Sequence, residues 1–300
     1  MLPFDGANDN SLSEAASIYA NLLTFGHRPW QYVLTQGIAQ GGRNVAWNPN
    51  QYLKFSGHRL RPALDLLLRI PDFPARTVAD LGAGAGNVTK LLKERWSDAD
   101  VTAVEGSAEM VAAGRKAAPE VNWLHADLGA WAPAAKFDVI YSNAALHWLP
   151  AHDTLFPKLL QCVAPGGILA VQMPRNFEAP SHTLIAETAL NGPWRSKLEH
   201  LVTPPPVQGP AFYHNLLKPE AQNLDIWETE YLQVLSGENP VKEWTKGTWL
   251  MRYLDLLQGT EKTAFEAAYA ERVAKAYPPN ASGETLFPFR RLFMIAQRNG

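Results

Sequence analysis

A glycine-rich turn between a short apolar run and a helical pattern constrains the fold more than any other feature of this chain. The run TVADLG, residues 77–82, is apolar and closed by glycine, as is typical of a buried strand. The turn DLGAGAG leads directly into NVTKLLKERW, residues 87–96, whose apolar side chains return at helical spacing. A strand, a glycine turn and a helix in this order form a βα unit in which a ligand can lie against backbone N–H groups.

Strand-like and helix-like runs continue to alternate beyond this unit. Further strands are predicted at 100–106, 121–127, 137–143 and 168–174, and a helix at 107–117. Ser107 offers that helix an amino-terminal cap, and its expected buried face carries Met110, Val111 and Ala113. This rhythm predicts an α/β fold, a Rossmann-like, seven-stranded, mostly parallel sheet with helices on both faces.

After Pro174 the alternation is interrupted. Strand patterns return only at 225–235 and 286–297, which would complete the seven strands. Proline clusters, scattered tryptophans and a long helical stretch near 263–277 occupy the remaining sequence. We therefore expect one α/β domain over residues 47–300, with a mainly helical substrate or lid insertion at about 175–224 and 236–284.

Residues 1–46 precede the first strand and contain the aromatic stretch IYANLLTFGHRPWQYVL. Such a stretch is expected to cover apolar surface. We therefore predict an amino-terminal arm that forms a lid or contacts the second subunit of a homodimer.

Composition limits the partners and the compartment. The chain has 27 Lys+Arg against 29 Asp+Glu, a net charge of -2, so no basic field attracts nucleic acid or an anionic membrane. No apolar stretch reaches the roughly 18 residues that span a membrane, and the amino terminus lacks the pattern of a signal peptide. Cys162 is the only cysteine, which excludes an intrachain disulfide and any multi-cysteine metal centre. We expect a cytoplasmic protein that acts on a small molecule without a metal ion.

Acidic residues end three successive predicted strands beside the glycine turn. Asp80, Glu105 and Asp127 would lie together, because the carboxyl ends of parallel strands meet at one edge of a sheet. Glu105 follows the turn by about 20 residues, where a carboxylate can accept hydrogen bonds from both ribose hydroxyls, and Asp127 would lie level with an adenine edge. A dinucleotide site is the competing interpretation, but its fingerprint has two residues between the second and third glycines, and this turn has one. The carboxylates could also simply cap the following helices.

With these features the chain resembles the class I S-adenosylmethionine-dependent methyltransferases, and more closely the trans-aconitate methyltransferase family. The similarity extends from about Trp47 to the carboxyl terminus. It rests on the segments WNPNQYLKF (47–55), RLRP (59–62), DLGAGAG (80–86), NAALHWLP (143–150), LAVQMP (169–174), GPW (192–194), AYPP (276–279) and RLF (291–293). The resemblance implies S-adenosylmethionine as cofactor, with candidate contacts at Asp80, Gly82, Ala83, Gly84, Glu105, Gly106, Met110, Asp127, Leu128 and Asn143.

Several residues depart from the family pattern where the substrate is expected. His147 stands where the family usually has glutamine, and Arg175 where it has aspartate. Met251 stands where an arginine is expected, with Arg252 in the next place. The cofactor half of the pattern is intact, so these changes bear on the acceptor of the methyl group.

Arginine and histidine provide the candidate chemistry for the acceptor. Planar guanidinium groups bind carboxylates in a bidentate manner, and a neutral imidazole can act as a base or as a hydrogen-bond donor near pH 7. We predict catalytic roles for His147, Arg61 and Arg252. The other predicted substrate contacts are Tyr52, Arg59, Trp148, Arg175, Trp194, Tyr213, Trp249, Tyr277 and Arg291. Ordinary core packing for the aromatic residues and a solvated surface for the arginines are the alternatives.

The resemblance implies methyl transfer to a carboxylate oxygen of a small polycarboxylic acid similar to trans-aconitate. Such a carboxylate has a pKa of about 4 and is ionised at neutral pH, so the reaction needs no general base. Three alternatives stay open at this point. One is a methyltransferase that acts on a phenol, enol or carbon acid with His147 as base, and another is an S-adenosylmethionine-binding protein without catalysis. The third is a dinucleotide-dependent oxidoreductase.

Overall fold

The structure, a computed structural model, describes residues 60–300. The predictions for the arm at 1–46, for Tyr52 and for Arg59 therefore lie outside the described residues. Among the described residues, no helix combines the length and the hydropathy that crossing a membrane requires.

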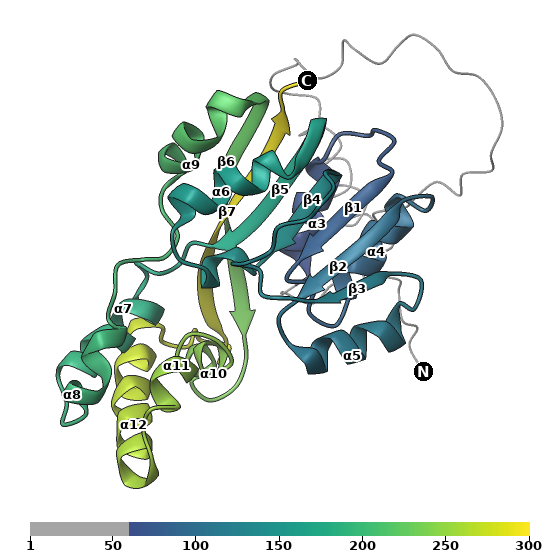
Figure 1. Ribbon diagram of the computed structural model, residues 1–300. Coiled ribbons are helices and arrows are strands. Elements are labelled where there is room, and N and C mark those ends of the chain that lie inside the picture. Colours follow the sequence, from purple (N-terminus) through teal and green to yellow (C-terminus); the bar gives the residue numbers. More distant parts are fainter. Residues whose placement is uncertain (1–59) are drawn as a thin grey trace, which may run out of the picture. The chain divides into compact units, whose positions relative to one another are not determined.

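Seven strands within residues 60–300 form one sheet in the order β3-β2-β1-β4-β5-β7-β6 (Figure 1). The strands are β1 (Thr77–Leu81), β2 (Asp100–Glu105), β3 (Asn122–His125), β4 (Phe137–Asn143), β5 (Val163–Pro174), β6 (Ala221–Leu235) and β7 (Thr285–Arg298). Strands β1 to β5 pair in parallel, and β7 lies antiparallel between β5 and β6. The predicted seven-stranded, mostly parallel sheet is confirmed. Its strand order reverses between β1 and β4, the place where open α/β sheets bind ligands.

Helices cover both faces of the sheet (Figure 1). One face carries α3 (Arg61–Arg69), α4 (Asn87–Arg95) and α5 (Ala108–Ala117), and the other carries α6 (His152–Gln161) and α9 (Pro210–Leu217). Side chains of one strand alternate between the two cores, since Val139 and Tyr141 face the first and Ile140 the second. A near-continuous apolar strand such as β4 is therefore buried on both sides.

Helix α5 is capped by the predicted residue, but the side of the helix that is buried differs from the predicted one. The Ser107 hydroxyl accepts a hydrogen bond from the backbone N–H of Met110 at 3.3 Å, which confirms the cap. The buried residues are Val111 and Gly114, so the prediction that Met110 and Ala113 are buried was wrong. The Trp123 ring occupies the place where a Cβ at Gly114 would lie, and this close packing turns the Gly114 edge toward the sheet.

A second group of helices, called the cap below, lies at one end of the sheet (Figure 1). Its members are α7 (Pro180–Leu190), α8 (Arg195–Leu198), α10 (Pro240–Lys246), α11 (Met251–Leu254) and α12 (Gly259–Ala276). They share a core that includes Trp194, Tyr253 and Phe265. Short 3-10 turns are η2 (Leu146–Trp148), η3 (Glu199–Leu201) and η4 (Lys218–Glu220).

Strands β6 and β7 connect the sheet to the cap. Strand β5 ends where Pro174 pairs with Arg291, whereas β6 and β7 continue to pair as far as Leu235 and Thr285. Arg291 thus lies at the point where the sheet narrows to a two-stranded ribbon. Helix α9, within the predicted 175–224 insertion, contacts α6 and β6 and belongs to the sheet side of the molecule.

Candidate active site

The glycine turn after β1 has a backbone that only glycine adopts readily. Gly82 and Gly84 have φ angles of +78° and +57°, in the left-handed region. A Cβ on Gly82 would also collide with the Cβ of Ala145, which belongs to the loop after β4. No atom lies within 4 Å of the place where a Cβ on Gly84 would be, so that side of the turn is open to a ligand.

Glu105, the last residue of β2, holds this turn in place. One of its carboxylate oxygens accepts a hydrogen bond from the backbone N–H of Gly84 at 2.9 Å. The other accepts from the backbone N–H of Ser107 at 2.9 Å, where α5 begins. The carboxylate therefore links the turn to the start of the next helix, and its remaining lone pairs can accept hydrogen bonds from a bound ligand.

Asp80 lies beneath the turn and is 2% exposed. Its carboxylate accepts a hydrogen bond from the Thr89 hydroxyl at 2.6 Å. Burial raises the pKa of Asp80 to about 7; the Thr89 hydrogen bond opposes this shift, and the charge of Glu105 adds to it. A cation bound at the turn would favour the ionised form of this residue.

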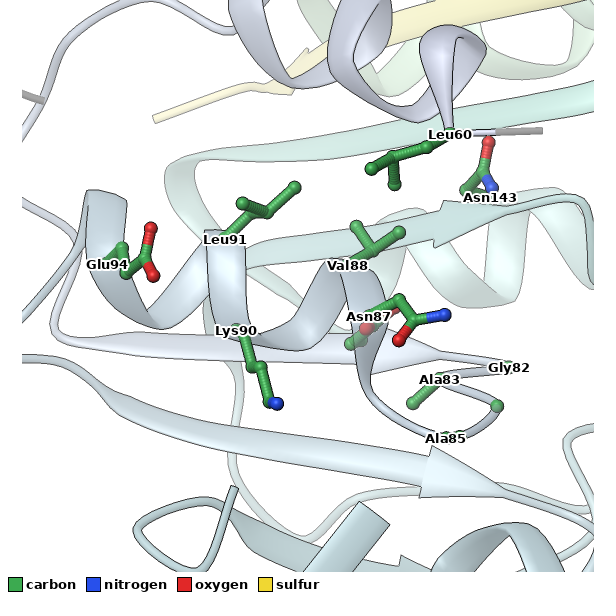
Figure 2. Close-up of a pocket in the computed structure, with 12 residues that line it drawn as sticks. Leu60, Gly82, Ala83, Ala85, Asn87, Val88, Lys90, Leu91, Glu94 and Asn143 are labelled. Atoms are coloured by element: carbon green, nitrogen blue, oxygen red, sulfur yellow. The ribbon is translucent and has the colours of Figure 1, made fainter. Parts of the chain in front are cut away.

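Two cavities flank the turn. The α4 cavity, of about 500 Å³, lies beside that helix. Figure 2 shows Leu60 and Asn143 at one end of it, with side chains of α4 along its length. The Glu105 cavity, of about 580 Å³, lies on the other side of Gly82.

These two cavities bring together most of the residues predicted to hold the cofactor. The α4 cavity is lined by Asp80, Gly82, Ala83, Gly84 and Asn143, and the Glu105 cavity by Gly82, Glu105, Gly106, Asp127 and Leu128. Met110 is outside both linings; it lies in the first turn of α5, 47% exposed. His125 lines the Glu105 cavity and was missed, although it stands two residues before Asp127 at the end of a predicted strand.

A third cavity, of about 270 Å³, lies between the end of the sheet and the cap; we call it the Arg291 cavity. Its wall from the sheet side includes Asn143, Ala144, His147, Trp148, Pro174, Phe289 and Arg291. The cap side contributes Phe177, His182, Trp244, Thr248 and Trp249. Asn143 also lines the α4 cavity, and Ala144 and Trp148 also line the Glu105 cavity. The three cavities therefore meet at the loop after β4.

A buried cation lies in this third cavity. Arg291 is 6% exposed, its guanidinium donates to the Gln172 side-chain oxygen at 3.4 Å, and it lies 4.8 Å from the ring centre of Phe289. A guanidinium keeps its positive charge at neutral pH and can bind a carboxylate in a bidentate manner. The position therefore suits a ligand that carries a carboxylate.

His147 lies beside this cation in its neutral form. It is 6% exposed, and its ring centre is 4.6 Å from that of Trp148. The pKa of His147 is lowered to about 3, mainly by burial and to a smaller extent by interactions with Arg291, His152 and His182. An imidazole with so low a pKa is a weak base at neutral pH and a suitable hydrogen-bonding group.

Unsatisfied polar atoms gather around the same cavity. Within residues 60–300, the buried side-chain atoms without a hydrogen-bond partner include Asn143 Oδ1, His147 Nδ1 and Gln172 Nε2. Asn143 on β4 is paired with Gln172 on β5, and β5 is the strand next to β7, which carries Arg291. Buried polar groups are nearly always paired, so this concentration indicates a binding site for a polar ligand.

The other predicted arginines within residues 60–300, which are Arg61, Arg175 and Arg252, do not line the Arg291 cavity. Arg175 forms an ion pair with Glu228 at 2.9 Å. Arg61, on the exposed side of α3, lies 5.1 Å from the ring centre of Tyr231. Arg252 stacks on Trp249 at 4.3 Å, so it supports a ring that lines the cavity.

The predicted aromatic contacts divide in the same way. Trp148 and Trp249 line the cavity and stack on each other, with ring centres 5.6 Å apart. Trp194 is buried in the cap core, and Tyr213 is buried against α6, where its hydroxyl lies 2.7 Å from His152 Nδ1. The Tyr277 hydroxyl accepts from the backbone N–H of Ser181, behind the cavity wall.

Comparison with known proteins agrees with this geometry. The family model described as a methyltransferase domain matches residues 78–167, which contain β1 without its first residue, the glycine turn and β2 to β4. A solved structure from Bacillus halodurans, described as a methyltransferase, covers 80% of this chain and 100% of its own at 13% identity, with a TM-score of 0.52. That similarity shows the fold alone. The fold and the site together define a class I S-adenosylmethionine-dependent methyltransferase.

Relatives of known name place the chain more closely. A trans-aconitate 2-methyltransferase from Azoarcus sp. is 49% identical over 252 residues, which cover 84% of this chain and 99% of the relative. Another from Rhodopseudomonas palustris is 43% identical, over 83% of this chain and 98% of the relative. A third, from Rhizobium meliloti, is 40% identical, over 85% of this chain and 100% of the relative. The chain belongs to the trans-aconitate 2-methyltransferase family.

Proposed function

We propose that this enzyme transfers the methyl group of S-adenosylmethionine to a carboxylate oxygen of trans-aconitate, or of a closely similar polycarboxylic acid, bound in the Arg291 cavity. The observation that carries this proposal is the buried guanidinium of Arg291 among unsatisfied polar atoms, next to the two cavities of the glycine turn. The names of the relatives support the same acceptor. A polyanion in a dry cavity requires a compensating cation, and Arg291 supplies it.

The residues at the turn fit the cofactor. Gly84 leaves open space where a side chain would stand, so the turn can lie directly against a ligand. Glu105 would bind the ribose hydroxyls and Asp127 the adenine edge, in the Glu105 cavity that both line. The methionine part would extend past Gly82 toward Asp80 and Asn143, in the α4 cavity. When bound, S-adenosylmethionine supplies an electrophilic methyl group on a cationic sulfur.

The protein then has to align and desolvate the acceptor. A carboxylate is ionised at neutral pH without a base, so proximity and preorganised electrostatics supply the acceleration. Arg291 would hold the acceptor, while Trp148 and Trp249 exclude water from the cavity that they line. The reaction forms a methyl ester and leaves S-adenosylhomocysteine.

The role proposed for His147 follows from its charge state. A group whose pKa is about 3 is a poor general base at pH 7, which disfavours an acceptor that must first be deprotonated. We propose instead that His147 forms a hydrogen bond to the acceptor. Arg61 and Arg252 would act from outside the cavity, Arg252 by supporting Trp249.

We also propose that the cap is the substrate lid, because its helices provide one side of the Arg291 cavity. For residues 1–46, which are outside the described part, the proposal is a lid or a homodimer contact. A cytoplasmic location is proposed for the enzyme. Deleting residues 1–46 should change the turnover or the mass in solution, and an unchanged truncated enzyme would count against an active arm.

Turnover with mass-spectrometric detection tests the proposed reaction. Purified enzyme, S-adenosylmethionine and trans-aconitate should give a product heavier by one methyl group in place of a proton, together with S-adenosylhomocysteine. Base-catalysed hydrolysis of the product should regenerate trans-aconitate, since a methyl ester is cleaved and a C-methyl group is not. Failure to form any ester from a panel of polycarboxylic acids would refute the proposal.

A further inference from the structure

Asn176 connects the two sides of the Arg291 cavity through one buried amide. Its side-chain oxygen accepts a hydrogen bond from the backbone N–H of Arg290 at 3.2 Å, next to Arg291 on β7. Its side-chain nitrogen donates to the Ser181 hydroxyl at 3.2 Å, at the start of α7. The side chain is buried, with 5% of the residue exposed. Asn176 therefore sets the position of α7 relative to the strand that carries Arg291.

The Ser181 hydroxyl in turn determines the tautomer of His182. It lies 3.0 Å from Nδ1 of the His182 ring. Among the described residues, Nδ1 is the acceptor that lies within hydrogen-bond distance of the Ser181 hydroxyl, so we assign the hydroxyl hydrogen to it, while the oxygen accepts from Asn176. Nδ1 is then an acceptor, and the proton of the neutral ring is on Nε2.

Two tyrosines, one in α12 and one directly after it, also bind the backbone of Ser181. The backbone N–H of Ser181 donates to the Tyr277 hydroxyl at 3.2 Å, and the Ser181 carbonyl accepts from the Tyr269 hydroxyl at 2.9 Å. The His182 ring contacts Phe177 and Trp249, with ring centres 5.2 Å and 6.2 Å away. These contacts fix the ring in the wall of the Arg291 cavity. The same wall faces a further cavity, of about 400 Å³, in the cap.

We propose that His182 is a second recognition point for the acceptor, whose Nε2–H donates a hydrogen bond to a carboxylate that Arg291 does not hold, with Asn176 and Ser181 as positioning residues. The inference rests on the proposed function and deepens it, because the cavity would then select acids with at least two carboxylates. A neutral donor suits this place because a second buried cation would add its own desolvation penalty. Burial lowers the pKa of His182 to about 4, so the ring stays neutral at pH 7.

Three substitutions at this residue separate the donor from the packing. In His182→Gln the amide nitrogen can reach the place of Nε2, whereas in His182→Asn the shorter amide reaches only the place of Nδ1. His182→Phe keeps an aromatic ring without polar atoms. We expect kcat/KM for trans-aconitate to fall about 10- to 100-fold in the Asn and Phe variants, because a charge-assisted hydrogen bond is lost, and to stay within about fivefold in the Gln variant. His214→Gln, on the exposed side of α9, is the control and should leave kcat/KM unchanged.

Equal losses of kcat/KM in all three variants, or activity retained in the Asn variant and lost in the Gln variant, would overturn the inference.

The protonation states of the two ring nitrogens of His182 provide a second readout. Nitrogen NMR of the free enzyme should show a protonated Nε2 and an unprotonated Nδ1 for His182. Ser181→Ala should lower the fraction of this tautomer, whereas Ser181→Thr should keep it. A wild-type ring protonated on Nδ1 would contradict the assignment. If the wild-type enzyme methylates no acid at all, the proposed function fails; if it methylates trans-aconitate and the Gln variant is no better than the Asn variant, only this inference fails.

Discussion

The carboxylate of Glu105, at the end of β2, accepts a hydrogen bond at 2.9 Å from the backbone N–H of Gly84, which lies 21 residues earlier in the turn after β1. The residue proposed to bind the ribose therefore also shapes the turn that receives the cofactor. Loss of its carboxylate should affect the pocket in two ways.

Glu105→Ala should weaken S-adenosylmethionine binding without unfolding the protein. The variant loses the ribose contact and the hydrogen bond to the turn, and each charge-assisted hydrogen bond contributes on the order of 1 to 3 kcal/mol. Calorimetric titration measures the change, with Glu109→Gln in the exposed first turn of α5 as the control. Unchanged affinity in Glu105→Ala, or tighter binding of NADH than of S-adenosylmethionine by the wild type, would contradict the cofactor assignment.

Gly82→Ala and Gly84→Ala form a matched pair, because both glycines have positive φ and only one is crowded. Gly84→Ala should lower the unfolding free energy by about 1 kcal/mol, because alanine is unfavourable at a positive φ. Gly82→Ala should cost more, because its Cβ meets that of Ala145. Adding Ala145→Gly to Gly82→Ala should recover the difference in denaturant unfolding. Equal stability of the two single variants would show that the close approach is unimportant.

The titration of Asp80 predicts how stability depends on pH. Its folded-state pKa of about 7 is higher than the ordinary value of 3.8, so between these values the folded state holds a proton that the unfolded state releases. The contribution of Asp80 to stability should therefore fall as the pH rises from about 4 to about 7, and should level off above that. The unfolding free energy of the wild type relative to Asp80→Asn should be higher at pH 5 than at pH 8. A difference that is the same at both values would contradict the raised pKa.

The acceptor class predicts the pH dependence of catalysis. The pKa of His147 is about 3 and that of His182 about 4, and the acceptor carboxylates titrate near pH 4, so none of them titrates between about pH 6 and pH 9. With S-adenosylmethionine saturating, so that its positive charge keeps Asp80 ionised, kcat/KM for the acceptor should be nearly flat over that range. His147→Ala should cost less than about tenfold. A phenol or carbon acid would instead give a rise with a histidine-like pKa and a loss of about 100-fold or more in His147→Ala.

Much of the sheet could be predicted because its signals are local. Strands β1, β2 and β4 are short runs rich in apolar residues, and Ser107 immediately precedes the helix that it caps. The candidate cofactor residues follow the same logic, since Asp80, Glu105 and Asp127 each lie within two residues of the end of a strand. One motif and its strand register are enough to place them along the edge of the sheet.

The acceptor cavity could be predicted only in part because it depends on long-range packing. Successive residues of a strand face opposite sides, and the sequence alone does not show that Arg290 is exposed and Arg291 buried. His182 and Phe177 reach the cavity because Asn176 and α12 fix the start of α7, and no local pattern records those contacts. Tyr213 and Trp249 are both aromatic residues without a local pattern that distinguishes them, yet Tyr213 is buried in the core and Trp249 lines the cavity.

The most direct test of the account compares Arg291→Gln with Arg252→Gln in steady-state methylation of trans-aconitate. Arg291 lines the cavity, whereas Arg252 stacks on Trp249 and is outside the lining. Each substitution therefore removes one positive charge, the first inside the cavity and the second outside it. Arg291→Gln should lower kcat/KM by an amount equivalent to about 2 to 5 kcal/mol, because a buried carboxylate loses its partner, while the affinity for S-adenosylmethionine stays unchanged. Arg252→Gln should cost less than about 1 kcal/mol. Near-normal kcat/KM in Arg291→Gln, or a larger loss in Arg252→Gln, would show that the acceptor does not bind where this structure places its cation.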